Sequence, residues 1–276
     1  MKIVITTLLL TATLTSIAQK VTLNLAKGLK IVETVSITNS SSFSVQGRDM
    51  ENAATASFIN TYVVDDATAG KQQVTATSDK LKVTASQMGQ ELAYDSDKKD
   101  NDGTVEEMLK PLVGTKNTYT IDAQGNATTE KPVEDKMEIT MLTGGIMPKA
   151  NVSKMYLASL LNQDLKVGLA WQDSTEIKGD NSSKTVNSYT VTAIDGDVVS
   201  ITNNATNVNS GKAEMNGMEL AMSGNTKITE RIAMSIKTGL ITTIETTRDG
   251  TLTASVAGME IPITSKATIK TSYTAQ

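Results

Sequence analysis

Apolar and polar residues alternate with a period of two along most of this chain. Near residue 30 the apolar positions are Leu29, Ile31, Val35 and Ile37, and near residue 230 they are Ile228, Ile232, Met234 and Ile236. Successive side chains of a β-strand point to opposite faces, so this spacing predicts strands with one buried face. Thr, Ser, Val and Ile are abundant while aromatic residues make up 3% of the chain, and β-branched side chains also favour sheet.

Short turn sequences separate the alternating runs. They are DAQGN at 122–126, IDGD at 194–197, KTG at 237–239 and RDG at 248–250. Gly and Asp in such short connections join hairpin strands, whereas parallel strands need connections of a dozen or more residues. The sequence therefore predicts antiparallel sheet.

Two segments carry a helical pattern instead. Thr104–Glu107 has the form of a capping box and is followed by apolar residues at helical spacing, and Pro111 is expected to end that helix early. The second segment, Val152–Leu161, places Met155 and Leu160 on one side. An apolar helical stripe must cover another surface, and a curved sheet would provide it.

The two halves of the chain resemble each other. Three pairs of segments match in the same order: 25–37 with 165–177, 62–77 with 189–203, and 88–96 with 215–223. Internal duplication explains the shared order. We therefore expect an all-β fold of antiparallel strands in two related modules, as a curved half-barrel or as sandwiches, with two or three short helices. The expected boundaries are 1–18 for a signal peptide, 19–135 for the first β module, 136–164 for a partly helical connector and 165–276 for the second β module.

The first eighteen residues have the pattern of a signal peptide. Lys2 precedes an apolar run, Ile3–Leu14, and small residues stand at Ser16 and Ala18. The run is too short to cross a bilayer comfortably, which predicts cleavage near Ala18 and a periplasmic or secreted protein. No later stretch has the apolar length of a transmembrane segment, and the absence of Cys excludes a lipid-anchoring cysteine and disulfides.

The residue types limit the chemistry. The chain has no His and no Cys, which removes Ser-His-Asp and Cys-His catalysis and the usual zinc sites. No pair of carboxylates and no Ser-Lys arrangement is marked by its context, so we expect no catalytic residues, no enzyme activity and no cofactor. The net charge is −4 and no basic stripe is visible, which argues against a nucleic-acid partner.

One acidic stretch has to be tested as a calcium loop. The sequence ELAYDSDKKDNDG contains four aspartates: Asp95, Asp97, Asp100 and Asp102. A calcium loop that began at Asp95 would need a ligand at its fifth position and Gly at its sixth, where Lys99 and Asp100 stand. Asp is also common in turns because its side chain bonds the nearby backbone. We expect a solvated turn and no metal site, and the sequence leaves open whether these aspartates ever bind a cation.

Methionines suggest a surface for an apolar ligand. The candidate lining residues are Met155, Met215, Met218, Leu220 and Met222. Methionine is flexible and polarizable, so it suits surfaces that accommodate varied apolar ligands. The same pattern arises where methionine fills gaps in a core that has few aromatic residues.

Several segments recur in one order along nearly all of the mature chain. They are LNLAKGLK (23–30), LAYDSD (92–97), GTKNTYTIDAQGN (114–126), LKVGLAW (165–171) and SIKTGLI (235–241). In this order they resemble an uncharacterised family of exported β-rich proteins of Bacteroidota, a domain of unknown function. The resemblance implies export and two related halves, and it brings no known activity or site residue. Leu29 and Leu169 stand where that family tends to have Asp, so no role of the Asp is transferred.

Three functional hypotheses follow. The first is an exported, non-catalytic protein that binds an apolar or amphipathic small molecule or lipid in the cell envelope. The second is a structural module that interacts with an envelope protein or a glycan, and it predicts a solid core. The third is a hydrolase that uses carboxylates, which would need acidic side chains converging in a cleft.

Overall fold

A computed structural model of the chain describes residues 19–276. The exceptions are residues 46, 69, 88, 102, 131–136, 144–145, 180–181, 216–217 and 257–258, and the side chains of residues 137–138, 141, 213–215, 218–220 and 256. Of the residues placed in this way, no helix has the length and apolar character needed to cross a membrane.

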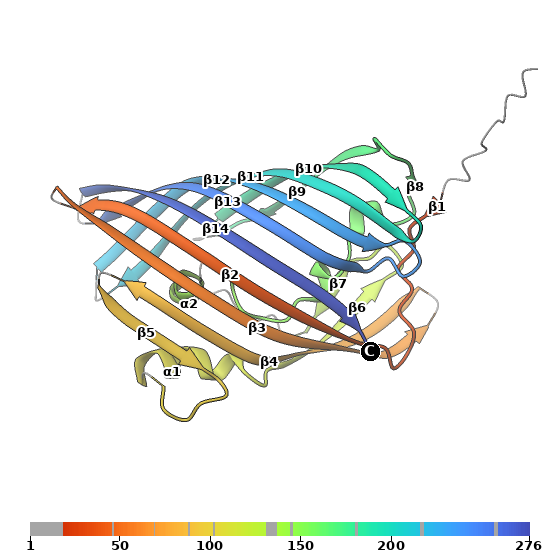
Figure 1. Cartoon of the computed structure of the whole chain (residues 1–276), viewed down its shortest axis with the longest axis horizontal. Coiled ribbons are helices and arrows are strands. Elements are labelled where there is room, and N and C mark those ends of the chain that lie inside the picture. The colour runs from red at the N-terminus through yellow and green to blue at the C-terminus, as the bar shows by residue number, and fades with distance from the viewer. Residues whose placement is uncertain are drawn as a thin grey trace, which may run out of the picture.

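Twelve antiparallel strands form one curved sheet, which confirms the predicted all-β class (Figure 1). The order across the sheet is β7-β6-β4-β3-β2-β14-β13-β12-β11-β10-β9, and β5 pairs with β4 beside β6. The strands are β2 Lys30–Val45, β3 Arg48–Thr68, β4 Lys71–Gln87, β5 Gln90–Asp95, β6 Lys116–Asp122, β7 Ala127–Thr129, β9 Ala170–Ile177, β10 Ser182–Asp195, β11 Val198–Met215, β12 Met218–Ser235, β13 Ile241–Val256 and β14 Met259–Ala275. The pairing of β14 with β2 joins both ends of the chain in a single sheet that does not close. A separate small pair joins β1 (Gln19–Lys20) to β8 (Asp164–Leu165).

The helices are few and short. α1 spans Gly103–Leu109 and continues as a 3₁₀ turn over Lys110–Leu112, so the expected helix is present and ends near Pro111. The expected helix over Val152–Leu161 is wrong, because this stretch forms two separate 3₁₀ turns, Val152–Lys154 and Ala158–Leu160. A short helix that the pattern missed, α2, spans Met137–Leu142.

One predicted turn lies inside a strand. The RDG sequence at 248–250 falls in the middle of β13, paired on both sides. A Cβ on Gly250 would lie 2.5 Å from the Ser265 Oγ and 3.2 Å from the Thr226 Oγ1. Gly250 therefore faces side-chain hydroxyls of the two neighbouring strands, and the RDG sequence forms no turn.

The concave face of the sheet is filled at the end where β1 and the C-terminus lie. The inner segment, defined here as residues 146–165, crosses this face and buries Val152, Met155 and Leu160 completely. Inward side chains of β3, β4, β10, β11 and β12 pack around it, together with Val21 and Leu25 from the N-terminal stretch. The backbone N–H of Ile241 donates to the Met155 carbonyl at 2.8 Å. The segment is thus an integral part of the main core.

A second core lies farther along the same concave face. α1 contributes Val105 and Leu109, and α2 contributes Ile139, to a cluster with inward residues of β2, β3, β4 and β14. In Figure 1, α2 lies inside the curve behind β2, and α1 lies beside β5. These short helices therefore cover the part of the sheet formed by β2, β3, β4, β5 and β14.

The N-terminal stretch is fixed by a contact that only Gly permits. Gly239 has φ +70°, and a Cβ on it would lie 2.6 Å from the Thr22 carbonyl oxygen. The backbone N–H of Asn24 donates to the Thr238 carbonyl at 3.0 Å in the same place. The turn after β12 and the stretch after β1 therefore pack backbone against backbone.

Replacing Gly239 with Ala tests this contact. The change forces a side chain into the left-handed region, which costs about 1–2 kcal/mol, and pushes the Thr22 backbone away from its place. The control is Gly196→Ala, because Gly196 also has positive φ but its Cβ would meet nothing within 4 Å. We expect Gly239→Ala to lower the free energy of unfolding by about 1–3 kcal/mol more than the control, measured by urea unfolding. Equal losses in the two variants would show that the Thr22 contact contributes nothing.

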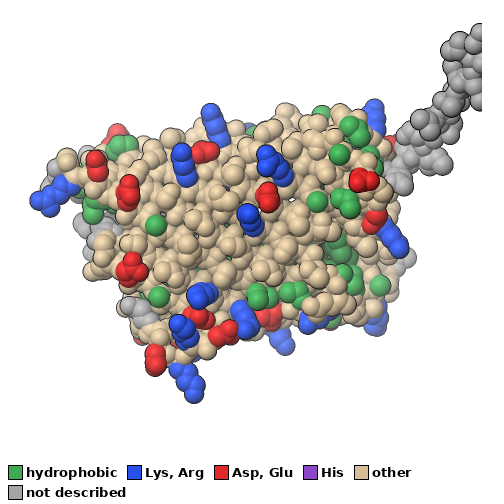
Figure 2. All heavy atoms as spheres, viewed as in Figure 1, with side chains coloured by type: hydrophobic (Ala, Val, Ile, Leu, Met, Phe, Trp, Pro, Cys, Tyr) green, Lys and Arg blue, Asp and Glu red, His purple; other side chains and the backbone are tan. Residues whose placement is uncertain are grey.

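The viewed face of the molecule is mostly uncharged. Figure 2 shows Lys, Arg, Asp and Glu side chains scattered among other polar atoms, with both signs mixed. This agrees with the outward Thr, Ser and Asn residues of the long strands. The face offers no single-sign patch for electrostatic steering.

Candidate functional site

The predicted ligand-lining methionines do not all lie in one described place. Met155 is completely buried in the main core. Met222 lies on β12 and is partly exposed. Met215, Met218 and Leu220 lie on β11 and β12, and their side chains are outside the described residues. Met222 is therefore the one predicted residue whose described side chain is accessible to a ligand.

A buried carboxylate, which the sequence analysis missed, lies between the sheet and the inner segment. Glu33 is 3% exposed. Its Oε2 accepts from Asn60 Nδ2 at 2.6 Å and from the Tyr62 hydroxyl at 2.8 Å, and its Oε1 accepts from the Tyr273 hydroxyl at 2.8 Å. These donors come from β3 and β14, the two strands that flank β2. The carboxylate is thus held by three donors from its own sheet.

The same tyrosines fasten the inner segment. The Tyr62 hydroxyl accepts from the Asn151 backbone N–H at 3.1 Å, and the Tyr273 hydroxyl lies 3.1 Å from the Lys154 carbonyl. Burial first, and then the charge of Glu33, raise the pKa of both Tyr62 and Tyr273 well above the usual tyrosine range. Both phenols therefore stay protonated and can donate. We interpret the Glu33 cluster as a structural fastening, because its polar groups are directed at the protein itself.

Besides the Glu33 cluster, a row of hydrogen-bonded polar side chains, called here the second polar row, crosses the concave face from β9 to β13. Hydrogen bonds run from Asn187 to Asp173 at 2.8 Å, from Asn203 to Asn187 at 3.0 Å and from Asn203 to Glu230 at 2.9 Å. The Thr246 hydroxyl reaches the other Glu230 oxygen at 3.3 Å. The row thus connects β9, β10, β11, β12 and β13 through their inward side chains.

This second row carries charge into a partly buried place. Burial first, and then the charges of Asp173 and Glu230, raise the pKa of Tyr189 well above the usual tyrosine range. Burial lowers the pKa of the inward Arg248 on β13, and the charge of Glu230 opposes that effect. An acidic and a basic side chain therefore face the concave side near the middle of the sheet.

Apolar side chains lie between this polar row and the ends of the β2–β3 and β13–β14 hairpins, away from the inner segment. Phe43, Ile263 and Leu252 are directly cross-paired on β2, β14 and β13, and Met222, Ala254 and Ile261 form the next row on β12, β13 and β14. All but Ala254 are partly exposed, and none belongs to the three buried clusters. We call these six residues the far apolar face. They follow the alternation of the inward residues, so they lie on the concave side.

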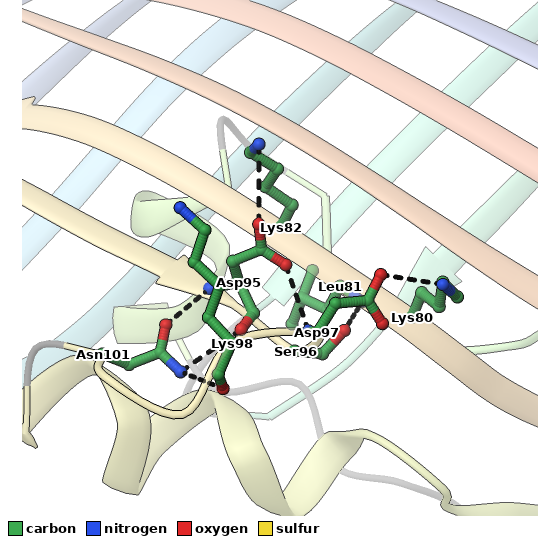
Figure 3. A network of polar contacts seen from close by, with 8 residues as sticks. All are labelled: Lys80, Leu81, Lys82, Asp95, Ser96, Asp97, Lys98 and Asn101. Carbon is green, nitrogen blue, oxygen red and sulfur yellow. Dashed lines mark hydrogen bonds and ion pairs between the residues drawn. The ribbon is translucent and has the colours of Figure 1, made fainter.

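The aspartate stretch forms a turn closed by its own hydrogen bonds (Figure 3). The Asn101 side chain bonds the Asp95 backbone N–H at 2.8 Å and the Asp95 carbonyl at 3.2 Å. The Asp97 backbone N–H, and more weakly the Lys82 cation, hold the pKa of Asp95 below its usual range. Lys80 lies 2.7 Å from the Asp97 carboxylate.

This geometry favours a charged turn over a calcium loop. Two lysines are paired with two of the four candidate aspartates, Asp100 lies in the following exposed loop, and Asp102 lies outside the described residues. Within the described part of the chain, no group of three or more acidic side chains is arranged to hold a metal ion.

Two surface hollows lie away from the methionines. One of about 420 Å³ lies beside α1 and is lined by Gly103, Glu106, Glu107, Lys110 and Pro111. The other, of about 210 Å³, lies between the N-terminal stretch and the β3–β4 and β6–β7 turns. Neither is lined by Met155 or Met222, and neither collects the convergent polar groups of a typical ligand site.

A comparison with known protein families finds one match, to part of the chain. Residues 149–241, about a third of the chain, match a model described as "Family of unknown function (DUF6263)". This agrees with the expected resemblance to proteins without a known activity and indicates no enzyme family. None of the curated proteins matches the chain.

Solved structures give only distant similarity. OccK7 (OpdD) of Pseudomonas aeruginosa has 7% identity and a TM-score of 0.32, with 90% of this chain and 100% of that chain covered. An outer membrane channel of Pseudomonas putida F1 has 7% identity and a TM-score of 0.26, with 93% and 98% covered. The translocator domain of the autotransporter NalP of Neisseria meningitidis has 6% identity and a TM-score of 0.21, with 90% and 89% covered. Scores this low do not establish a common fold, so nothing is transferred from these proteins.

Proposed function

We propose that this protein is an exported, non-catalytic binding protein of the cell envelope that holds an apolar or amphipathic ligand against the far half of its concave face. The observation that carries the proposal is the far apolar face, where cross-paired side chains such as Phe43, Ile263 and Leu252 are only partly buried. Contiguous apolar surface of this kind is usually covered in solution.

The polar groups next to this face favour an amphipathic ligand. Arg248 lies four residues from Leu252 on the same face of β13, and Glu230 lies on the neighbouring β12. At about 3.3 Å per residue, four residues span about 13 Å, the length of a medium acyl chain. An apolar chain on Leu252 and Ile263 would thus direct its polar end toward Arg248 and Glu230. Ligand sites of this composition are mostly apolar with a few placed polar groups.

Replacing Ile263 with Glu tests the proposal. A charge in the middle of the far apolar face would have to be desolvated by a bound apolar chain. We expect delipidated protein to enhance the fluorescence of dansylundecanoic acid, and Ile263→Glu to weaken its binding by about tenfold or more, which is about 1.4 kcal/mol.

The control for this test is Thr264→Glu. Thr264 is the next residue of β14, is exposed and points to the convex face, so it gains the same charge without touching the far apolar face. Its probe affinity should equal that of the unmodified protein. Absence of probe uptake by the unmodified protein, or equal losses in the two variants, would contradict the proposal.

An interaction module is the second candidate, favoured by a different observation. The inner segment fills the part of the concave face near β1 and the C-terminus with a solid core, as that hypothesis predicts. Among the described strands, β9 stands at an edge with one side unpaired. A partner would bind at this edge and not on the concave face. The two candidates therefore use different surfaces.

We further infer that the two halves arose by duplication. Gly28 and Gly168 both have φ above +80° and both donate to a carbonyl at 2.8 Å, that of Val64 and that of Val191 respectively. The Glu33–Asn60 bond of 2.6 Å has a counterpart in the Asp173–Asn187 bond of 2.8 Å. The strand pairing shifts register after Val64 and again after Val191. These pairs have the sequence offsets of the matching segments, 168 − 28 = 140 and 191 − 64 = 127.

A further inference from the structure

The strand β9 lies at an edge of the sheet. It spans Ala170–Ile177 and, in the part of the chain that the structure describes, pairs with β10 alone. At the opposite edge, β7 has three residues and β5 packs against α1. Of the strands that the structure describes, β9 is therefore the longest with an open side, and open edges are templates for pairing with another strand.

The alternation of hydrogen-bonded pairs between β9 and β10 shows which backbone groups of β9 point to the open side. The Val191 N–H donates to the Leu169 carbonyl at 2.9 Å, just before β9 begins. Bonded pairs alternate in an antiparallel ladder, so Trp171, Asp173 and Thr175 direct their backbone groups to β10. The backbone groups of the even-numbered residues, with Ser174 near the middle, point away from β10.

A second copy of β9 fits this pattern in one favoured register. Two-fold pairing centred on Ser174 sets Ser174 opposite itself and Gln172 opposite Glu176, and all of these are residues with outward backbone groups. The pairing sets Asp173 opposite Thr175 and Trp171 opposite Ile177. Shifting the pairing by two residues toward the start of β9 sets Asp173 opposite Asp173, and like charges directly opposite are destabilising. Shifting it the other way sets Ile177 opposite Asp173.

One exposed apolar side chain stands near each end of this edge. Ile177 is 54% exposed at the end of β9, and Val167 is 61% exposed just before its start. In the favoured register Ile177 of one copy lies opposite Trp171 of the other, on the same face of the joined sheet. Directly opposed non-bonded residues are the closest cross-strand neighbours. Pairing of two copies would therefore cover an apolar side chain that a single copy leaves in water.

We propose that the protein forms a two-fold symmetric dimer through antiparallel pairing of β9 with β9, with Ser174 at the axis. A strand pair of eight residues buries a small interface, so the dimer is expected to be weak and concentration-dependent. The proposal is independent of ligand binding, because it uses the open edge and not the far apolar face.

Proline at the axis is the direct test. Ser174→Pro removes an outward N–H but no bond to β10, and Pro is tolerated on edge strands when its missing N–H faces solvent. Ser174→Ala keeps the N–H and is the matched control. In sedimentation velocity over a range of concentrations, we expect a monomer–dimer equilibrium for the unmodified protein and for Ser174→Ala, and a monomer for Ser174→Pro. The urea unfolding midpoint of Ser174→Pro is measured alongside to verify that the variant is folded.

A single cysteine tests the register without relying on proline. The chain has no Cys, so Ser174→Cys would introduce one thiol per copy. Opposite residues of a bonded antiparallel pair have Cα atoms about 5.5 Å apart, within the range of a disulfide. Oxidation should give a covalent dimer with Ser174→Cys but not with Val198→Cys, since Val198 is 43% exposed on β11. A monomer at all concentrations, a dimer unaffected by Ser174→Pro, or equal cross-linking of both cysteine variants would each overturn the proposal.

Discussion

Replacing Glu33 with Ala should lower the free energy of unfolding by about 3–5 kcal/mol. The change leaves three buried donors, Asn60 Nδ2 and the hydroxyls of Tyr62 and Tyr273, without the acceptor that they share. It also loosens the inner segment, because the same hydroxyls contact the backbone of Asn151 and Lys154. Urea unfolding followed by the fluorescence of Trp171 would measure the loss.

Two further variants separate the acceptor from the charge. Glu33→Gln keeps one acceptor oxygen but sets an NH₂ group against a donor, so we expect an intermediate loss. Glu245→Ala removes an exposed carboxylate from β13 of the same sheet and should change stability by less than about 0.5 kcal/mol. If Glu33→Ala is as mild as Glu245→Ala, the Glu33 cluster is not a fastening.

The alternation of the sequence predicts the strands well because each strand buries one face. In β2 the buried residues are Ile31, Glu33, Val35 and Ile37, separated by more exposed ones. The same alternation contains the signal for the Glu33 cluster, since a carboxylate stands at a position of the apolar face. Asp173 and Glu230 occupy inward positions of β9 and β12 in the same manner. A search for charged residues at positions of the apolar face would have found the Glu33 cluster and the second polar row.

The mistaken helix has a cause that lies outside its own sequence. In Val152–Leu161 the Met155 carbonyl accepts from Ile241 and the Lys154 carbonyl lies beside the Tyr273 hydroxyl. These carbonyls bond to the sheet instead of to the next helical turn. The local pattern of apolar residues was helical, but tertiary hydrogen bonds decided the conformation. Sequence spacing alone does not contain that competition.

The aspartate turn is explained by its place in the sheet. β4 pairs with β5 along 82–87 and with β6 along 71–77, whereas β11 pairs with the single long strand β12 along 198–215. If the halves are related, β5 and β6 together correspond to β12, and residues 96–115 interrupt that strand with the turn and α1. The turn is then the start of an insertion that brings a covering helix to the first half. This role requires no bound cation.

The same type of substitution, Met to Ala, tests the core at Met155 and the proposed ligand surface at Met222. Met155 is completely buried among Val152, Leu160 and the inward residues of the sheet. Met155→Ala should lower the free energy of unfolding by about 2–5 kcal/mol through lost burial and the cavity that remains. Its affinity for dansylundecanoic acid, measured where the variant is fully folded, should be unchanged.

Met222→Ala should show the opposite behaviour. Met222 is partly exposed on the far apolar face, beside Ala254 and outside the buried clusters, so its loss should change stability by less than about 1 kcal/mol. The same truncation removes apolar contact from the proposed ligand surface and should weaken probe binding severalfold. Because the two variants delete the same atoms, any difference between them reports the surroundings of the side chain. If Met155→Ala weakened probe binding and Met222→Ala left it unchanged, the ligand would bind at the inner segment and not on the far apolar face.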